Sequence, residues 1–303
     1  GAARAAMNGG AFRAGTIAGI GRPNVGKSTL LNRLIGEKLC ITSAKPQTTR
    51  HAVRGVLTRA DCQYVFVDTP GYQTRHRTAL NRAMNRSVSR TLAQVDLVFL
   101  VIEAGAFGRA DREVASLLPA GVPAVLVINK IDRLGRREEL LPILHALSGE
   151  SAFAEVVPVS AEKADNIETL LRVARSHLPV GEAQYPADEL TDRDERFLAA
   201  ELLREKLFRR LGDELPYGLT VQVERFEEEA GAMRRICAVV IVDRPGHKAI
   251  VIGRGGGVLK RVATDARLDM ERLFGSRVFL EVWVRVRAGW SDDERSLRSL
   301  GYD

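Results

Sequence analysis

The chain has 303 residues, of which 45% are hydrophobic, so it is long enough for about two domains with buried cores. No apolar run approaches the roughly 18 residues of a membrane-spanning helix. Cys40, Cys62 and Cys237 are too scattered to form a metal site, and such usage fits a reducing compartment. The net charge is +7, but residues 191–303 hold 21 Lys/Arg against 20 Asp/Glu. Charge alone therefore does not mark the C-terminal part as a polyanion binder.

Residues 1–15 begin with small and polar amino acids and lack the apolar core of a secretory signal, so we expect a disordered tail or a cloning remnant. Residues 16–180 alternate strand-like apolar runs with amphipathic helical stretches such as 28–34, 111–118 and 138–147. The runs are Thr16–Ile20, Tyr64–Val67, Leu97–Ile102, Ala124–Ile128 and Val156–Val159. This alternation predicts an α/β domain with a mostly parallel sheet and helices on both faces. Ligands should bind beyond the carboxyl ends of its strands.

Residues 181–193 are predicted to be a linker, because prolines and a glycine interrupt the pattern at their start. Residues 194–303 then predict a second, α+β domain. Its expected elements are a helix over 194–211, two strands over 219–226 and 235–242 that can pair as a hairpin, a short aliphatic strand at 250–252, a glycine-rich loop, a helix, and a last strand over 277–286.

The first functional motif, G-x-x-x-x-G-K-S, follows the first apolar run and opens a helix. Glycines let the backbone wrap phosphate groups, and the positive end of the helix dipole favours their charge. We expect Lys27 to reach the β- and γ-phosphates and the Ser28 hydroxyl to ligate Mg²⁺. The predicted phosphate-binding residues are Gly21, Arg22, Pro23, Asn24, Val25, Gly26, Lys27, Ser28 and Thr29. A chance glycine-rich turn and a phosphate-loop ATPase are the alternatives for this motif alone.

The motif N-K-I-D at 129–132 closes another run and favours guanine as the base. The Asp132 carboxylate can accept from the ring N–H and the exocyclic amine of guanine, and Asn129 can bond on the N7 side. Adenine lacks this pair of donors, so the carboxylate would be left unpaired at a cost. Ser160 and Ala161 are expected to bring a backbone amide to the guanine carbonyl. The predicted base-binding residues are Asn129, Lys130, Asp132, Ser160 and Ala161. Alone, N-K-x-D is also compatible with a solvated turn.

A third motif, Asp68-Thr69-Pro70-Gly71, ends the run Tyr64–Val67. Asp68 suits an outer-shell contact to Mg²⁺. The Gly71 amide can sense the γ-phosphate, so this loop can change shape when that phosphate leaves. Upstream, Thr48 and Thr49 lie in a polar segment, and either can complete the Mg²⁺ shell. The predicted metal-binding residues are Ser28, Thr49 and Asp68, and an ordinary polar loop is the alternative for 47–50.

Together these motifs resemble the GTP-binding domain of the Era family of ribosome-assembly GTPases. The closest details are Pro23-Asn24, Gln47-Thr48-Thr49-Arg50-His51 and Asp68-Thr69-Pro70-Gly71. The resemblance implies GTP hydrolysis, with GTP or GDP and Mg²⁺ bound. It also implies that Tyr72 normally replaces the glutamine that positions water in signalling GTPases. A K⁺ ion held with the help of Asn24 would then stabilise charge, and the catalytic residues would be Lys27, Asn24, Thr49 and Gly71. A loop residue that bonds to its own backbone is the alternative for Asn24.

The glycine-rich loop Gly253–Gly256 fits the G-x-x-G loop of a KH domain, which clamps about four nucleotides of a single strand. Two strands before it, a helix after it and a closing strand predict the type II KH arrangement. Arg254 is expected to meet a phosphate, and Ile250 and Ile252 are expected to line an apolar groove. The predicted RNA-binding residues are His247, Lys248, Ile250, Ile252, Gly253, Arg254, Gly255, Gly256, Lys260 and Arg261. A lone G-x-x-G is otherwise a common helix-entry turn.

Gly289–Arg295 also resembles the end of Era proteins, so the resemblance covers nearly all of 16–303. It implies a cytoplasmic monomer that binds the 3′ end of small-subunit ribosomal RNA and the 30S subunit. Peripheral contact with the inner membrane surface is an alternative. An RNA chaperone with a merely structural nucleotide pocket, and a tRNA- or ribosome-acting relative, are competing functions. A basic cluster, either a solvated helix face or an RNA contact, comprises Arg75, His76, Arg77, Arg82, Arg86 and Arg90.

Overall fold

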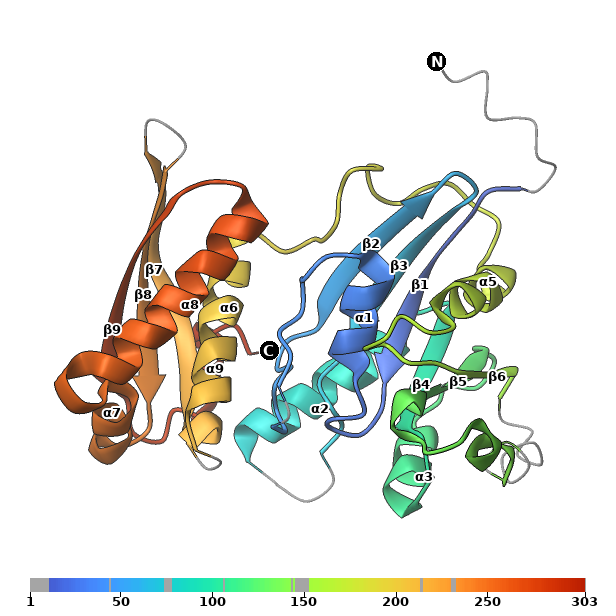
Figure 1. The fold of residues 1–303 in the computed structure, drawn as a ribbon, viewed down its shortest axis with the longest axis horizontal. Helices are drawn as coiled ribbons and strands as arrows, with labels where there is room; N and C mark the ends of the chain where they lie inside the picture. The colour runs from blue at the N-terminus through green and yellow to red at the C-terminus, as the bar shows by residue number, and fades with distance from the viewer. Residues whose placement is uncertain are drawn as a thin grey trace. The chain divides into compact units, whose positions relative to one another are not determined.

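The computed structural model describes residues 11–302, except 44, 74–77, 106, 143, 145–152, 213–214 and 230–232. Arg75, His76 and Arg77 of the predicted basic cluster lie outside the described residues. The chain divides into two compact units, which Figure 1 shows. The first unit comprises Gly1–Cys40, Thr49–Arg75 and Met84–Asp192, and the second comprises Ile41–Thr48, His76–Ala83 and Arg193–Asp303. Two short segments from the predicted first domain thus pack with the second unit.

A six-stranded sheet forms the first unit, in the order β2-β3-β1-β4-β5-β6. The strands are β1 (Arg13–Ile20), β2 (Val53–Arg59), β3 (Cys62–Asp68), β4 (Leu97–Glu103), β5 (Ala124–Asn129) and β6 (Glu155–Pro158). Pairing is parallel throughout these strands except between β2 and β3, which confirms the predicted sheet. The sequence does not predict β2, because Gly55 interrupts its apolar pattern. A Cβ at Gly55 would lie 3.0 Å from Cγ1 of Ile35, so the strand packs closely against the side chains of the first helix.

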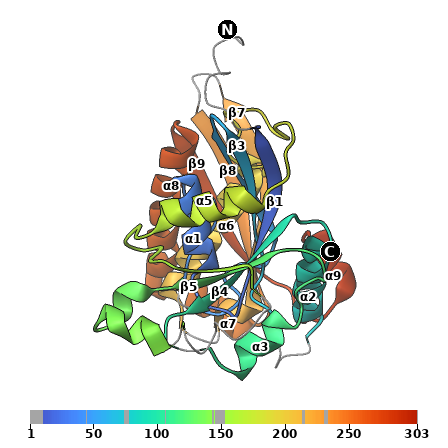
Figure 2. The ribbon, with the colours of Figure 1, turned by 90° about the vertical axis from the view of Figure 1, so that its right-hand side faces the viewer.

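Helices cover both faces of this sheet, as Figures 1 and 2 show. Helix α1 (Lys27–Ile35) contacts α5 (Ile167–His177) on one face. On the other face, α2 (Ala79–Leu92) and α3 (Arg109–Ala115) join alternate residues of β1, β4 and β5 in one buried cluster. Burial on both faces explains the continuous apolar runs that predict these strands. The predicted helix at 138–147 extends beyond the described residues.

The predicted linker at 181–193 is hydrogen-bonded along the first unit over much of its length. The buried Gln63 side chain accepts from the backbone N–H groups of Gln184 and Tyr185 at 2.6 and 3.0 Å, and donates to the Tyr185 carbonyl at 2.8 Å. Further along, the Leu190 carbonyl accepts from the Val56 N–H at 2.9 Å. A buried glutamine amide needs such partners, so this segment is ordered by the sheet edge that it follows.

The second unit has a three-stranded sheet in the order β7-β8-β9, with α6 and α8 packed on one face. Its elements are α6 (Glu195–Arg210), β7 (Leu219–Glu229), β8 (Met233–Val242), α7 (Pro245–Ile252), α8 (Gly257–Phe274), β9 (Val278–Val286) and α9 (Glu294–Ser299). Strands β7 and β8 form the predicted antiparallel hairpin, and β9 pairs with β8 in parallel. The arrangement confirms an α+β KH unit.

Helix α7 differs from the prediction, which takes residues 250–252 as a strand. Pro245 occupies the first turn of this helix, where its missing N–H costs nothing, and Gly253 ends it. Of the three aliphatic residues only Val251 is fully buried, since the helix turns Ile250 outward. An apolar run this short does not distinguish a strand from a helix. The flanking Pro245 and Gly253 are the signals that indicate a helix here.

The C-terminal segment is anchored to the hairpin by two aromatic residues. The Trp290 indole is fully buried and donates to the Gly218 carbonyl at 3.1 Å. The Tyr302 hydroxyl lies 2.8 Å from the Thr220 hydroxyl. These contacts make the tail part of the second unit.

Among all helices of the described chain, none is both long and apolar enough to cross a membrane.

Candidate functional site

The phosphate loop joins β1 to α1, and its glycines are structurally required. Gly21 and Gly26 have φ angles of +156° and +97°. A Cβ at Gly21 would lie 2.4 Å from the Val101 carbonyl oxygen, and one at Gly26 would lie 2.3 Å from Asn129 Nδ2. Both backbone conformation and close packing therefore exclude other residues. The loop lies at the carboxyl end of β1 and the N-terminus of α1, where an anion is favoured.

Lys27 bridges this loop with its side chain. It is buried, and Nζ donates to the Gly21 and Arg22 carbonyl oxygens at 3.1 and 2.9 Å. Burial lowers the pKa of Lys27 from 10.5 to about 8, and the nearby Asp68 carboxylate opposes this shift. Phosphate groups at the loop would favour the charged ammonium. Lys27 is therefore placed to contribute charge to phosphate binding, and its protonation should be linked to that binding.

Nucleotide affinity should consequently fall as pH rises through 8. Below this pH the free protein already carries the charged Lys27, whereas above it binding must take up a proton. For one such proton, the Kd of a non-hydrolysable GTP analogue should rise roughly 30-fold between pH 7 and 9.5. Calorimetric titration measures this change. The Lys27→Arg variant, which stays charged, should lose the Lys27 part of the dependence, and an equal slope in both proteins would contradict the assignment.

Three oxygen-bearing side chains meet next to Lys27. The Ser28 hydroxyl donates to Asp68 Oδ2 at 2.6 Å and lies 2.8 Å from the Thr49 hydroxyl, which donates to the same Oδ2 at 3.1 Å. Asp68 Oδ1 is buried without a hydrogen-bond partner among the described residues. Burial raises the pKa of Asp68, while Lys27 opposes the rise. Hydroxyls, a carboxylate and an unsatisfied buried oxygen suit Mg²⁺, so these residues fit the predicted ion.

Thr48, the other candidate for this site, faces elsewhere. Its hydroxyl donates to the Lys45 carbonyl at 2.6 Å, within its own turn. Its backbone carbonyl accepts from Arg204 of α6. The structure thus brings Thr49, and not Thr48, to Ser28 and Asp68.

Asn129 joins the predicted base-binding residues to the phosphate loop. Its buried Nδ2 donates to the Val25 carbonyl at 2.9 Å, and Oδ1 accepts the Ala161 N–H at 3.0 Å. The amide nitrogen has a second donor position, which can serve the N7 side of guanine. The Ala161 N–H donates to Asn129, because the buried amide oxygen needs a donor. The contact of a backbone amide of this segment with the guanine carbonyl stays a prediction.

Asp132 is exposed at the same edge, as recognition of a base requires. Its Oδ1 accepts from the Ser160 hydroxyl at 2.5 Å, and the Ser160 oxygen accepts from the Lys163 N–H at 3.0 Å. A carboxylate has about four acceptor positions, so capacity remains for the guanine N–H groups. Ser160 is therefore placed to orient Asp132, a role that the sequence does not suggest.

Two acidic residues outside the sequence motifs form ion pairs with residues in or next to the phosphate loop. Glu103 pairs with Lys130 at 2.9 Å, and the Lys130 ammonium donates to the Asn24 carbonyl at 2.6 Å. The buried Asp111 of α3 pairs with Arg22 at 2.6 Å. Glu103 ends β4, so its place at the carboxyl end of a strand is a usable signal. Asp111 has no comparable signal, since its partner is 89 positions away.

The Asp68–Gly71 loop lies against the phosphate loop. A Cβ at Gly71 would lie 3.0 Å from Cα of Pro23, so only glycine allows this approach without displacement. Asn24, next to Pro23, has φ +68° and an exposed side chain. Tyr72 packs partly buried against the cluster of β1, β4 and β5. Tyr72 therefore acts as an apolar anchor for the loop, and Asn24 remains exposed for a ligand.

The G-x-x-G loop connects α7 to α8 in the second unit. Gly253, Gly255 and Gly256 have φ between +57° and +76°. A Cβ at Gly253 would lie 2.4 Å from Cγ2 of Val258, whereas Gly255 and Gly256 border open space. The first glycine is thus needed for packing, and the last two leave room for a nucleic-acid backbone.

The surface around this loop is basic. No acidic residue occurs between Asp243 and Asp265. The exposed residues of this stretch include Lys248, Ile250, Arg254, Lys260 and Arg261, while Ile252 is half-buried. His247 is turned inward beside Gly218, and its Nδ1 is buried without a partner in the described chain. The structure therefore presents all the predicted RNA-binding side chains on one segment except His247.

Comparison with known proteins agrees with this geometry. A family described as 50S ribosome-binding GTPase matches residues 16–130, and the KH domain family matches 214–291. Proteins named GTPase Era from Nitrosomonas eutropha and Chromobacterium violaceum are 50% and 53% identical, over 98% and 96% of this chain and 100% and 98% of theirs.

Two solved structures of Era proteins are similar to this chain over nearly its whole length. Era in complex with MgGDPNP and nucleotides 1506–1542 of 16S ribosomal RNA superposes with a TM-score of 0.93 at 35% identity, covering 96% of this chain and 99% of that one. An Aquifex aeolicus Era variant bound to GDP and aluminium fluoride gives the same values. The first unit is accordingly a GTPase domain that binds guanine nucleotides and hydrolyses GTP. The chain belongs to the GTPase Era family.

Proposed function

We propose that the protein is a GTP-dependent switch that binds single-stranded small-subunit ribosomal RNA near its 3′ end through the KH unit, and acts in assembly of the 30S subunit. One observation carries the proposal. The segment Ile41–Thr48 packs with the KH unit, while the next residue, Thr49, bonds to Ser28 and Asp68 of the nucleotide site. A change at the γ-phosphate therefore has a covalent route into the RNA-binding unit.

Arg204 of α6 holds the end of this segment. Its guanidinium is buried, donates to the Thr48 carbonyl, and pairs with Glu201 at 2.6 Å. A buried guanidinium is costly unless it is fully hydrogen-bonded, so the Thr48 carbonyl is part of what stabilises Arg204. Movement of Thr49 would disturb this bond directly.

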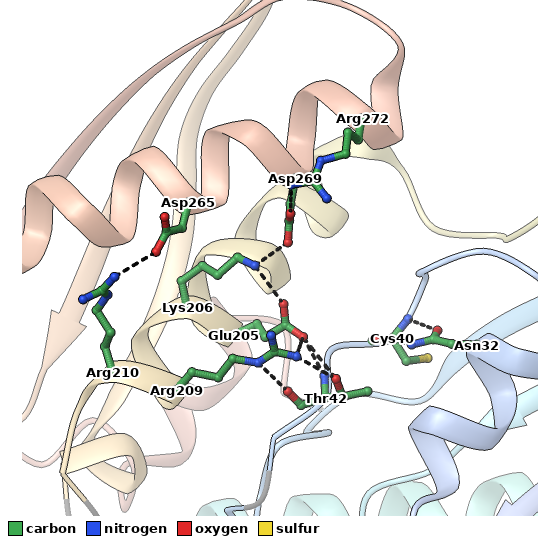
Figure 3. A network of polar contacts seen from close by, with 10 residues as sticks. All are labelled: Asn32, Cys40, Thr42, Glu205, Lys206, Arg209, Arg210, Asp265, Asp269 and Arg272. Atoms are coloured by element: carbon green, nitrogen blue, oxygen red, sulfur yellow. Dashed lines mark hydrogen bonds and ion pairs between the residues drawn. The ribbon is translucent and has the colours of Figure 1, made fainter. Parts of the chain in front are cut away.

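Glu205, the next residue of α6, holds the start of the segment, as Figure 3 shows. Its fully buried carboxylate accepts from the Thr42 N–H at 2.9 Å and the Thr42 hydroxyl at 3.3 Å. Arg209 completes the cluster by donating to the Thr42 carbonyl at 3.1 Å and to Glu205 at 2.9 Å. Lys206 links Glu205 to Asp269 of α8. The segment is thus tied to helix α6 directly and to helix α8 through Lys206.

The second nucleotide-responsive region has its own contact with the KH unit. The first N–H groups of α2, at Ala79 and Leu80, donate to Asp292 Oδ1 at 3.3 Å and to the Ser291 carbonyl at 3.1 Å. A helix N-terminus needs such acceptors. The C-terminal segment therefore caps the helix that follows the Asp68–Gly71 loop.

The residues of the site have separate roles in nucleotide binding and hydrolysis. Lys27 and the loop amides neutralise the β- and γ-phosphates, and the Ser28, Thr49 and Asp68 oxygens would hold Mg²⁺. When bound, Mg²⁺ supplies Lewis-acid stabilisation of phosphate charge. Loss of the γ-phosphate would remove the ligand contacts that hold Thr49 and Gly71 in position. The Ile41–Thr48 segment would then be free to move.

The RNA part of the proposal rests on the KH loop and on family membership. The related Era structure contains nucleotides 1506–1542 of 16S ribosomal RNA. The basic loop at Gly253–Gly256 provides the corresponding surface in this chain. A cytoplasmic location is part of the proposal, since ribosomal RNA is cytoplasmic, and so is a monomeric state.

Potassium should accelerate hydrolysis, because Tyr72 cannot position water and the exposed Asn24 can help to hold a cation at the phosphates. We expect GTP hydrolysis to be at least about tenfold faster in KCl than in NaCl, and faster again with a short RNA from the ribosomal 3′ end. Steady-state phosphate release measures both effects. Asn24→Ala should remove the difference between the ions and leave the response to RNA. If neither ion nor RNA alters the wild-type rate, the proposal is wrong.

A further inference from the structure

The exposed face of α2 carries three arginines in register. Arg82, Arg86 and Arg90 are four residues apart and all exposed, so they lie on one side of the helix. The opposite side is buried through Leu80, Ala83, Met84, Val88 and Leu92. We call Arg82, Arg86 and Arg90 the α2 arginine face. Its three side chains span about 12 Å along the helix axis.

The sequence around this face supplies no acidic residue. No Asp or Glu occurs between Asp68 and Asp96. Among the described residues, Arg86 and Arg90 form no hydrogen bond or ion pair, whereas Arg82 has a contact within the chain. Exposed arginines elsewhere are commonly paired, as Arg59 is with Glu168 and Arg285 is with Glu224. Arg86 and Arg90 therefore carry positive charge that no described residue pairs, and they lie on the same side of the helix as the exposed Arg82.

This arrangement opposes the stability of the helix that carries it. Like charges four residues apart repel each other, and Arg82 lies in the first turn, where the helix dipole disfavours a cation. A bound polyanion would offset both effects. The absence of lysine also fits, because a guanidinium makes paired hydrogen bonds to a phosphate group that an ammonium cannot make.

We propose that the α2 arginine face binds the phosphate backbone of ribosomal RNA outside the nucleotides held by the KH loop, without reading their sequence. A G-x-x-G loop clamps only about four nucleotides, so most phosphates of a ribosomal RNA are left for other surfaces. A nucleic-acid strand in a duplex presents a phosphate about every 3.4 Å of axis, so the face spans about three of them. This inference rests on the proposed RNA binding and extends it to a second surface.

The test compares the salt dependence of binding to a full-length 16S ribosomal RNA transcript. Replacing Arg82, Arg86 and Arg90 by glutamine should flatten the slope of log K against log salt concentration by about 2 to 3 and weaken binding at least about tenfold at low salt. A matched triple variant with glutamine at Arg109, Arg112 and Arg172, all exposed on α3 and α5, makes the same change in net charge and should leave the slope unchanged. Melting temperatures show that both variants fold.

A third variant separates failure of this inference from failure of RNA binding itself. Gly255→Asp places a carboxylate in the open KH loop and should weaken RNA binding. The contribution of the α2 arginine face to the salt dependence should remain. If Gly255→Asp weakens binding but the arginine-face variant keeps the wild-type slope, the inference is overturned and the proposed function stands. If Gly255→Asp has no effect, the proposed function fails. If the arginine-face variant loses only its binding to phosphatidylglycerol vesicles, the partner is a membrane and the inference is also overturned.

Discussion

Replacing Lys27 by alanine should lower the rate of GTP hydrolysis at saturating GTP by at least about a hundredfold, since removal of one preorganised donor at developing charge typically costs that much. The Lys27 ammonium is buried beneath the loop and, in the described structure, is bonded only to the Gly21 and Arg22 carbonyls. Its charge is therefore poorly solvated, and its electrostatic attraction to a phosphate group is correspondingly strong. Single-turnover phosphate release measures the effect apart from binding.

The control for this variant is Lys163→Ala, which removes an exposed lysine of the same unit and should keep the wild-type rate. Circular dichroism establishes that Lys27→Ala is folded. A loss of less than threefold in hydrolysis would show that the loop binds nucleotide without catalysing its cleavage, as expected of a merely structural pocket.

The second large effect is expected at Arg204. Replacing it by methionine should remove the buried guanidinium that pairs with the Glu201 carboxylate, and breaking a buried pair in this way costs about 3–5 kcal/mol. The free energy of unfolding, from urea denaturation, should fall accordingly. RNA binding should also lose its dependence on nucleotide state, because the Thr48 carbonyl no longer has its donor.

Stability and coupling can be separated with a double variant. Glu201→Leu together with Arg204→Met replaces the pair by apolar side chains of similar size, a change that is often neutral for stability. We expect this protein to be as stable as the wild type and still uncoupled. If the double variant keeps the wild-type ratio of RNA affinities in GTP and GDP, Arg204 is only a structural residue.

The nucleotide site could be predicted from sequence because its determinants are local. The loop at Gly21–Ser28, Asp68–Gly71 and the N-K-x-D segment each follow a buried strand, and parallel strands bring their ends together. The structure does bring Ser28, Thr49 and Asp68 within hydrogen-bonding distance of one another. The choice between Thr48 and Thr49 could not be made, because adjacent residues in an irregular loop have no pattern that fixes their direction.

The connections between parts of the chain could not be predicted. Arg204 bonds to a carbonyl 156 positions away, and Glu205 accepts from a residue 163 positions away. Hydrogen bonds to backbone groups place no demand on the identity of the partner residue, so they leave no trace in its sequence. The sequence predicts a strand in place of helix α7 for a different reason, since three aliphatic residues carry too little periodicity to distinguish the two.

The central claim is that the nucleotide state controls RNA binding. It is tested most directly by measuring the affinity of the intact protein for an RNA spanning nucleotides 1506–1542 of 16S ribosomal RNA, once with a non-hydrolysable GTP analogue and once with GDP. Coupling between sites in proteins typically amounts to about 5- to 150-fold, and we expect at least about tenfold tighter binding with the GTP analogue. Equal affinity in the two states would contradict the claim.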